Sequence, residues 1–266
     1  MSTNQSKIIT QYSTGREDGR ATISRSSNLE FHYTKKHLES FIKPDSRVLE
    51  VGCATGHYGF YYADKCKEYV GVDLVPSQIE LFNRKISDSG LKNISCHIGD
   101  ATNLKDITND SFDVVLCLGP MYHLPPEERE LVFAECRRVC KTGGIVAFAY
   151  INKIGVYVGA CVYDDDYYRE TYPNERANEF ILARGTDDLK PDTFYFTTPE
   201  EMDDTAGKHG LIKLRNLGTD FFITMSIINN MTDERFEVMK PLYEQMTSHE
   251  SCTGMSNHAL LICKKQ

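Results

Sequence analysis

Short apolar runs alternate with longer amphipathic segments along the first 150 residues. Uninterrupted apolar runs predict strands that are buried on both faces, at residues 48–51, 69–73, 93–98, 112–118 and 145–150. The segments around them place apolar residues at helical spacing and predict helices at residues 29–42, 57–67, 76–90 and 127–140. Strands that alternate with helices in this way predict right-handed crossovers and a doubly wound parallel sheet.

The alternation breaks after residue 151. Residues 152–197 contain nine aromatic residues interleaved with aspartates, and a segment this long between a strand and a helix is usually functional. Some of the rings must form the segment's own core, but a solvated loop would not carry so many. The pattern then resumes and predicts a helix at 198–210, a strand at 211–217, a helix at 232–246 and a last strand at 258–264.

The first strand ends in a turn of small residues. Gly52-Cys53-Ala54-Thr55-Gly56 has Gly-x-Ala-x-Gly spacing, which lets the backbone approach a ligand without interference from Cβ atoms. The second strand ends at Asp73, about 20 residues further on. A carboxylate at this place can accept hydrogen bonds from both hydroxyls of a ribose. The pattern therefore predicts a nucleoside bound at the edge of the sheet.

The same turn separates the possible cofactors. A dinucleotide turn reads Gly-x-Gly-x-x-Gly and binds a pyrophosphate, whereas here Ala54 stands at the second glycine and Glu50 precedes the turn. The carboxylate of Glu50 would repel a diphosphate but could help to bind a cationic amino-acid group. The sequence has no Gly-x-x-x-x-Gly-Lys-Ser/Thr loop, so the usual motif for a nucleoside triphosphate is absent.

Together the motifs resemble those of class I S-adenosylmethionine-dependent methyltransferases. The matching residues are 48–56, 73, 99–101, 112–115 and 138–144, in order and at normal spacing within residues 41–150. The resemblance implies an α/β fold: a doubly wound, Rossmann-like, seven-stranded sheet with an antiparallel last strand, and S-adenosyl-L-methionine as cofactor. It implies cofactor contacts from Glu50, Gly52, Cys53, Ala54, Gly56, Asp73, Leu74, Gln78, Asp100, Ala101 and Leu118. In this family the residue at Asp100 faces the adenine amino group, although Asp100 could also be a simple turn residue.

The resemblance also suggests a division of the chain. We expect residues 1–28 to form an N-terminal lid, residues 29–151 and 198–266 the methyltransferase domain, and residues 152–197 an inserted substrate cap. A frayed N-terminus is the alternative for residues 1–28. The residues expected to contact the acceptor are Tyr12, Arg16 and Arg25 of the lid and Tyr157, Tyr163, Tyr167, Tyr168 and Tyr195 of the cap.

The loop after the fourth strand carries the expected catalytic residues. Tyr122 and His123 follow that strand, and ligands of parallel sheets bind outside the carboxyl ends of strands. His123 is a candidate general base, or it holds the loop through hydrogen bonds to backbone. Tyr122 could orient the acceptor or pack under the adenosine. A base is needed only where the acceptor arrives protonated, because methyl transfer depends chiefly on alignment.

Composition narrows the partners. The net charge of −8 argues against a nucleic-acid backbone as the main ligand. The nine cysteines lack paired metal-ligand spacing, so we expect no metal site and reduced, mostly buried thiols in a cytoplasmic protein. No apolar run has membrane-spanning length. We expect a small-molecule acceptor, no nucleic-acid or membrane partner, and a monomer or homodimer.

The acceptor itself is not identified by the sequence. A pyrimidine carbon methyltransferase would have a Pro-Cys dipeptide, and an amino-group methyltransferase of adenine or glutamine would have Asn/Asp-Pro-Pro-Tyr; neither occurs. Transfer to an oxygen, nitrogen or sulfur atom of a small molecule is the expected reaction. Two alternatives stay open: an NAD(P)-dependent Rossmann oxidoreductase, and a protein that binds S-adenosylmethionine without catalysis.

Overall fold

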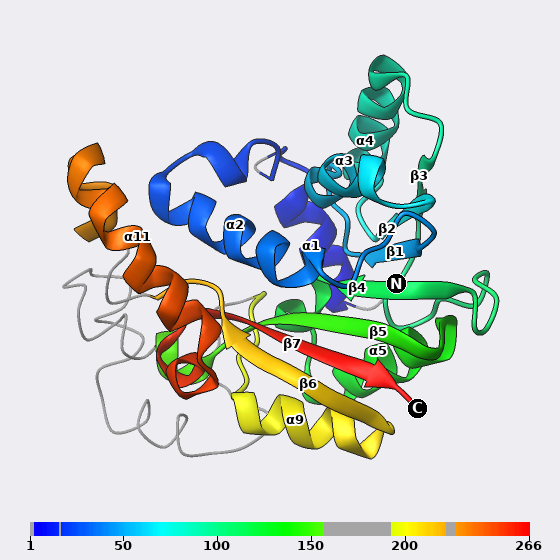
Figure 1. Ribbon diagram of the computed structural model, residues 1–266. Helices are drawn as coiled ribbons and strands as arrows, with labels where there is room; N and C mark the ends of the chain where they lie inside the picture. Colours follow the sequence, from blue (N-terminus) through cyan, green and yellow to red (C-terminus); the bar gives the residue numbers. More distant parts are fainter. Residues whose placement is uncertain (1–2, 16, 157–192, 222–226) are drawn as a thin grey trace.

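A computed structural model describes residues 3–15, 17–156, 193–221 and 227–266 (Figure 1). Its centre is one seven-stranded sheet with the order β3-β2-β1-β4-β5-β7-β6. The strands are β1 Arg47–Val51, β2 Glu68–Asp73, β3 Ile94–Ile98, β4 Phe112–Cys117, β5 Cys140–Ile151, β6 Leu211–Gly218 and β7 His258–Lys265. The first five strands are parallel, and β7 runs antiparallel to both of its neighbours. The predicted doubly wound sheet with an antiparallel last strand is confirmed.

Successive strand residues face opposite sides of the sheet and build two cores. On one side, Val114 and Leu116 of β4 lie in the core shared with the helices α2 Arg25–Glu39, α3 His57–Tyr62 and α4 Pro76–Ser89. On the other, Val115 and Cys117 lie in the core shared with α5 Pro126–Val139 and α9 Pro199–Lys208. Figure 1 shows the two groups of helices on opposite faces of the sheet. The order of β1 and β4 leaves an opening for a ligand at the carboxyl ends of the central strands.

Local signals in the sequence fix several helix ends. Thr198 caps α9, and its hydroxyl and the side chain of Glu201 form a reciprocal capping box. Pro76 begins α4, where its missing N–H has no intrahelical partner to lose. The helix α11 Asp233–Ser248 begins after its cap, Thr232. It packs beside α2 through a separate core that includes Tyr33 and Tyr243 (Figure 1).

Three boundaries differ from the prediction. The helix α5 ends at Val139, and Cys140 already pairs with Phe112 as the first residue of β5. The next residue of β5 that pairs with β4 is Ile145. Residues 141–144 therefore interrupt the strand pairing and do not form a separate turn. The helix α3 ends at Tyr62 and continues as the short 3₁₀ helix η2 Ala63–Lys65, and α2 begins at Arg25, after the N-cap Ser24.

The N-terminal segment contains a helix that the apolar pattern did not indicate. The helix α1 Thr3–Tyr12 is followed by the 3₁₀ helix η1 Arg20–Thr22, and Figure 1 shows α1 next to the central strands. Two further 3₁₀ helices are η3 Pro120–His123 and η4 Glu250–Met255. Within the described ranges, no helix combines the length and the apolar character needed to cross a bilayer.

Candidate cofactor and acceptor site

The glycine turn after β1 has the backbone geometry that its small residues allow. Gly52 has a φ of 81°, and a Cβ at this position would lie 2.5 Å from the ring of Pro120. Gly56 has a φ of 86°, and a Cβ there would lie 2.1 Å from Phe82. Neither position therefore accepts a side chain without movement of its neighbours. These two glycines hold the turn against the η3 loop and against α4.

Asp73 fixes this turn and remains on the cavity wall. Its Oδ2 accepts a hydrogen bond from the amide of Ala54 at 2.8 Å, and its Oδ1 accepts one from the amide of Val75 at 2.9 Å. Burial raises the pKa of Asp73 above its ordinary value, and the amide hydrogen bonds act in the opposite direction. A carboxylate has further lone pairs beyond these two bonds, so Asp73 can also accept from a ligand.

Glu50 lies under the same turn and is 1% exposed. Burial raises its pKa to about 8, although the hydroxyl of Tyr69 donates to Oε2 at 2.7 Å. The carboxyl group is therefore mostly protonated at neutral pH in the ligand-free protein. A cation in the adjoining cavity would favour its ionised form.

A cavity of 510 Å³ lies between the turn and the N-terminal segment. Its volume is typical of a small-molecule site, which spans about 300–1,000 Å³. Residues from the carboxyl ends of four parallel strands line one part: Glu50, Gly52, Cys53, Ala54, Asp73, Leu74, Gln78, Asp100, Ala101 and Leu118. The other part is more aromatic and is lined by Phe31, His57, Tyr58, Tyr122, Phe194 and Phe196, with Glu17, Arg20, Asn257 and His258.

The helix α1 lines part of this cavity and makes polar contacts with its wall. The side-chain amide of Gln5 donates to Oδ2 of Asp100 at 2.6 Å, while Thr102 donates to Oδ1. The side-chain amide of Gln78 donates to the carbonyl of Tyr12 at 2.8 Å. The other polar atom of that amide, Oε1 of Gln78, is buried and makes no hydrogen bond among the described residues. A buried acceptor without a donor is expected to gain one from a ligand.

His123 is held at both ring nitrogens. Nδ1 lies 2.9 Å from the carbonyl of Thr193, so it carries the proton, and Nε2 lies 2.8 Å from the hydroxyl of Tyr12 and accepts from it. Burial lowers the pKa of His123 to about 4. These contacts fit a residue that joins the η3 loop to α1. Burial also raises the pKa of Tyr122 well above its ordinary value, and its hydroxyl donates to the carbonyl of Leu118 at 3.4 Å.

Most of the predicted site residues that the structure describes line the one cavity. Gly56 supports the turn from behind and is not part of the lining. Arg25 lies elsewhere: its guanidinium donates to the carbonyls of Ile228 and Met231 and pairs with Asp233 at the start of α11. Tyr195 does not line the cavity either, and its amide donates to the carbonyl of Tyr122. Arg16, Tyr157, Tyr163, Tyr167 and Tyr168 lie outside the described residues.

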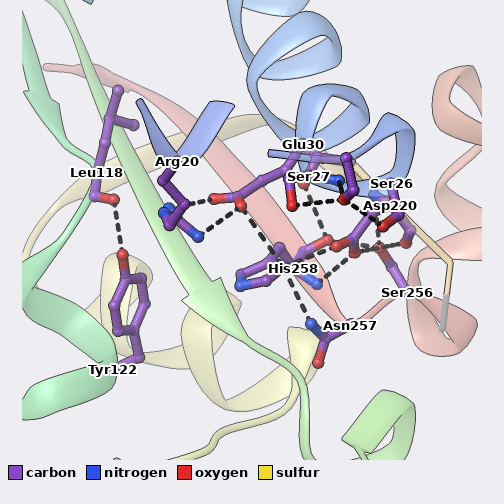
Figure 2. Close-up of polar contacts among 12 residues, drawn as sticks. Arg20, Ser26, Ser27, Glu30, Leu118, Tyr122, Asp220, Ser256, Asn257 and His258 are labelled. Atoms are coloured by element: carbon purple, nitrogen blue, oxygen red, sulfur yellow. Dashed lines mark hydrogen bonds and ion pairs between the residues drawn. The ribbon is translucent and has the colours of Figure 1, made fainter. Parts of the chain in front are cut away.

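A charged cluster beside the aromatic part of the cavity has no signal in the sequence. Figure 2 shows Arg20 and His258 on two sides of Glu30, with Asp220 next to the imidazole. Nη1 of Arg20 donates to Oε2 of Glu30 at 3.1 Å, and Nδ1 of His258 lies 2.7 Å from Oδ2 of Asp220. The four residues come from η1, α2, the segment after β6, and β7, so no local spacing connects them. Among the described residues, no group of three or more His, Cys, Asp or Glu side chains could hold a metal ion.

Comparison with known proteins agrees with the fold and with the cofactor part of the cavity. Residues 48–144 match the family model of a methyltransferase domain. The chain carries a class I methyltransferase domain. This confirms the predicted family, and the methyltransferase domain contains the glycine turn, Asp73 and Asp100.

The curated relatives match mainly over this domain. A ubiquinone biosynthesis O-methyltransferase of Hahella chejuensis is 30% identical over 110 residues, which are 41% of this chain and 45% of the relative. A second one, from Pseudomonas fluorescens, is 27% identical over 62% of this chain and 64% of the relative. An uncharacterised Rickettsia prowazekii protein is 34% identical over 40% of this chain and 19% of its own length. The match thus spans less than two thirds of these relatives.

Solved structures share the whole fold at low identity. The PH0226 protein of Pyrococcus horikoshii has a TM-score of 0.61 with 17% identity, and covers 92% of this chain and 93% of its own. A geranyl diphosphate C-methyltransferase of Streptomyces coelicolor has a TM-score of 0.60 with 12% identity, and covers 100% and 98%. At this identity the likeness concerns the fold, including the segments outside residues 48–144.

Proposed function

We propose that this protein transfers the methyl group of S-adenosylmethionine to an oxygen, nitrogen or sulfur atom of a small molecule. The observation that carries the proposal is the arrangement of Asp73, Glu50 and Gln78 around one cavity at the carboxyl ends of β1 and β2. Two carboxyl groups and an unpartnered amide oxygen are acceptors for a ligand with hydroxyl donors and a cationic end. The methyltransferase-domain match supports the same ligand.

The residues present fit this cofactor. Asp73 would accept from the ribose hydroxyls, and Glu50 would face the cationic amino-acid portion. Asp100 would bind the adenine amino group at the oxygen that now accepts from Gln5. Leu74, Ala101 and Leu118 would provide the apolar walls. When bound, the cofactor supplies an electrophilic methyl group on a positively charged sulfur.

The chain itself would contribute alignment and exclusion of water. The η3 loop, with Tyr122 and His123, lines the same cavity as the residues that would bind the cofactor. Its position is set by the bonds from His123 to Tyr12 and to the Thr193 carbonyl. We therefore assign His123 a positioning role within the site. Residues 1–28 would form the lid, because α1 contacts Asp100, Gln78 and His123 on the cavity wall.

The acceptor would occupy the aromatic part, which Phe31, Tyr58, Tyr122, Phe194 and Phe196 line. Two curated relatives are named as O-methyltransferases of ubiquinone biosynthesis, which agrees with a small-molecule acceptor. A dinucleotide-dependent oxidoreductase is disfavoured, because the match to the methyltransferase-domain model includes the glycine turn and Asp73.

Calorimetry and mass spectrometry test the proposal. We expect S-adenosylhomocysteine to bind the purified protein and NADH not to bind. With a deuterated methyl donor, incubation with a panel of small phenols, carboxylic acids, amines and thiols should give products of increased mass. Tight NADH binding would contradict the cofactor assignment, and cofactor binding without transfer to any panel member would favour the non-catalytic alternative.

A further inference from the structure

The aromatic part of the cavity contains two cationic groups, Arg20 and His258. The guanidinium of Arg20 and the imidazole of His258 both line the cavity, whereas the carboxylates of Glu30 and Asp220 do not. Glu30 and Asp220 are 7% and 1% exposed. Each cation thus lines the cavity and contacts a buried carboxylate, and Figure 2 shows these contacts.

Both cations share one carboxylate oxygen. Nη1 of Arg20 lies 3.1 Å from Oε2 of Glu30, and Nδ1 of His258 lies 3.9 Å from the same atom. Glu30 therefore holds the two groups on the same side of the cavity. Asp220 fixes the imidazole further, because its Oδ2 lies 2.7 Å from Nδ1 and its Oδ1 accepts from the amide of His258.

Each cation has one N–H that forms no aligned hydrogen bond within the described residues. Nδ1 of His258 donates to Asp220. The other ring nitrogen, Nε2, has no hydrogen-bond partner in the described part of the chain. Nε of Arg20 is buried and makes no hydrogen bond there either. It lies 2.9 Å from Oε2 of Glu17, but as an ion pair without hydrogen-bond alignment.

The imidazole is charged at neutral pH. Burial alone would lower the pKa of His258, but the carboxylates of Glu30 and Asp220 outweigh burial and the nearby Arg20, and raise this pKa to about 9. Two further groups face the ring. They are Tyr122, whose ring centre lies 6.4 Å away, and the side-chain amide of Asn257. His258 therefore offers a charged donor at Nε2 and not a proton acceptor.

We propose that Arg20 and His258 bind an anionic oxygen of the methyl acceptor, a carboxylate or an ionised phenol, and that Glu30 and Asp220 are their positioning residues. The inference rests on the proposed function and names the acceptor class. Charge-assisted hydrogen bonds from a guanidinium and an imidazolium are the strong contacts by which proteins hold such oxygens. An acceptor methylated at that oxygen would need no general base, because it arrives without a proton.

Replacement of Glu17 distinguishes an anionic acceptor from a cationic one. It is the one acidic residue of this cluster that lines the cavity, and it competes for Arg20. If the acceptor is anionic, Glu17→Gln should increase its affinity several-fold by freeing Arg20. If the acceptor is cationic, Glu17 would be its anchor, and the same change would weaken binding.

The experiment uses the full chain saturated with S-adenosylhomocysteine and aromatic probes that differ in charge. Calorimetric titration compares benzoate and 4-nitrophenolate with the neutral benzamide and the cationic benzylamine. We expect at least one anion to bind about tenfold or more tightly than benzamide, and the affinity of benzoate to fall as pH rises through 9. The preference between the two anions distinguishes a carboxylate from a phenol.

Variants locate the effect. Arg20→Gln and His258→Gln should each weaken anion binding about tenfold or more, because each variant loses a charge-assisted hydrogen bond to the anion. Arg47→Gln is the matched control, because Arg47 pairs with Glu68 at the opposite end of the sheet. Equal affinity for anions and benzamide in the wild-type protein, or weaker anion binding by Glu17→Gln, overturns the proposal. Normal binding of S-adenosylhomocysteine in the same titration shows that only this inference has failed, and the wild-type series does not depend on the folding of any variant.

Discussion

At the scale of single residues, three carboxyl groups of the cofactor part differ through their surroundings. Asp73 accepts hydrogen bonds from two backbone amides, and Asp100 accepts hydrogen bonds from Gln5 and Thr102. Glu50 is buried and accepts a hydrogen bond from the hydroxyl of Tyr69. Burial raises the pKa of both Asp73 and Glu50; backbone amides oppose this effect at Asp73, and the Tyr69 hydroxyl opposes it at Glu50. Their residue type was visible in the sequence, but their protonation was not.

Asp73→Asn should weaken S-adenosylhomocysteine binding about tenfold to a hundredfold, because charge-assisted hydrogen bonds to the ribose contribute roughly 1.5–3 kcal/mol. Asparagine keeps an oxygen acceptor for only one of the two turn amides, so circular dichroism must show an unchanged fold before the affinities are compared. Calorimetry gives the affinity, and the exposed Asp64→Asn serves as the control. Wild-type affinity in Asp73→Asn would refute the placement of the ribose.

Glu50 predicts a pH dependence of cofactor binding. Its pKa is about 8 in the ligand-free protein, and a cationic amino-acid group beside it would stabilise the ionised form. Binding should then release a proton, and affinity for S-adenosylhomocysteine should rise up to about tenfold between pH 6 and 8. Glu50→Gln should bind S-adenosylhomocysteine more weakly and without this pH dependence. Glu39 is exposed at the end of α2, so Glu39→Gln should behave as wild type. A flat wild-type profile would separate Glu50 from the cationic group.

At this scale, residue type and spacing together point to residues that the structure brings to one cavity. Gly52, Ala54, Asp73 and Asp100 follow strands that can be read from apolar runs, and the structure brings them to one cavity. The charged cluster is different, because Arg20 and His258 are 238 positions apart and meet only through the fold. His123 was visible as a histidine near the site, but the occupation of both its nitrogens depends on Tyr12 and Thr193.

At the scale of elements, the strands were easier to predict than the N-terminal helix. The buried strands are continuous apolar runs, which few other elements produce. The helix α1 is short and polar, and its polar contacts with the cavity wall run through side chains such as Gln5 and Tyr12. Its stability therefore comes from tertiary contacts that no local pattern encodes.

This dependence predicts that α1 responds to the cofactor. We expect S-adenosylhomocysteine to slow hydrogen exchange of residues 3–12 measurably, because α1 lines part of the cavity. Tyr12→Phe removes the bond to His123 and should speed exchange of α1 about twofold to tenfold, the effect of roughly 0.5–1.5 kcal/mol. Tyr61→Phe is the control, because its hydroxyl contacts Glu39 on the surface. Identical exchange with and without ligand would argue against a lid.

At the scale of the whole molecule, the aromatic part of the cavity is built by residues from near both ends of the described chain. Arg20 and Glu30 belong to the first 40 residues, and His258 begins the last strand, β7. The packing of α2 against α11 holds the same regions together through Tyr33 and Tyr243. The site is therefore complete only when β7 is inserted between β5 and β6. The protonation of His258 is thus tied to the stability of the whole fold.

The buried titratable groups predict the pH profile of unfolding. His37, His57 and His123 have pKa values lowered to about 4, chiefly by burial, so below pH 6.5 the unfolded chain binds more protons and stability falls as pH falls. His57 is exposed and contributes least. Glu50 acts in the opposite sense in this range, but as a single proton. Above pH 6.5 the folded protein binds more protons at Glu50 and at His258, so stability falls as pH rises through 8 and 9.

Thermal unfolding of the ligand-free protein should therefore have its highest Tm near pH 6–7. Each group that takes up a proton on folding changes stability by about 1.4 kcal/mol per pH unit, and about 1 kcal/mol shifts Tm by roughly 2–4 °C at this size. We expect Tm to fall by about 4 °C or more between pH 7 and 9. Asp220→Asn removes a carboxylate that raises the pKa of His258, so the Tm of this variant should fall less between pH 7 and 9 than that of the wild type. A Tm that still rises from pH 7 to 9 would mean that His258 is neutral in the folded protein, and the acceptor site would then lack one of its two charges.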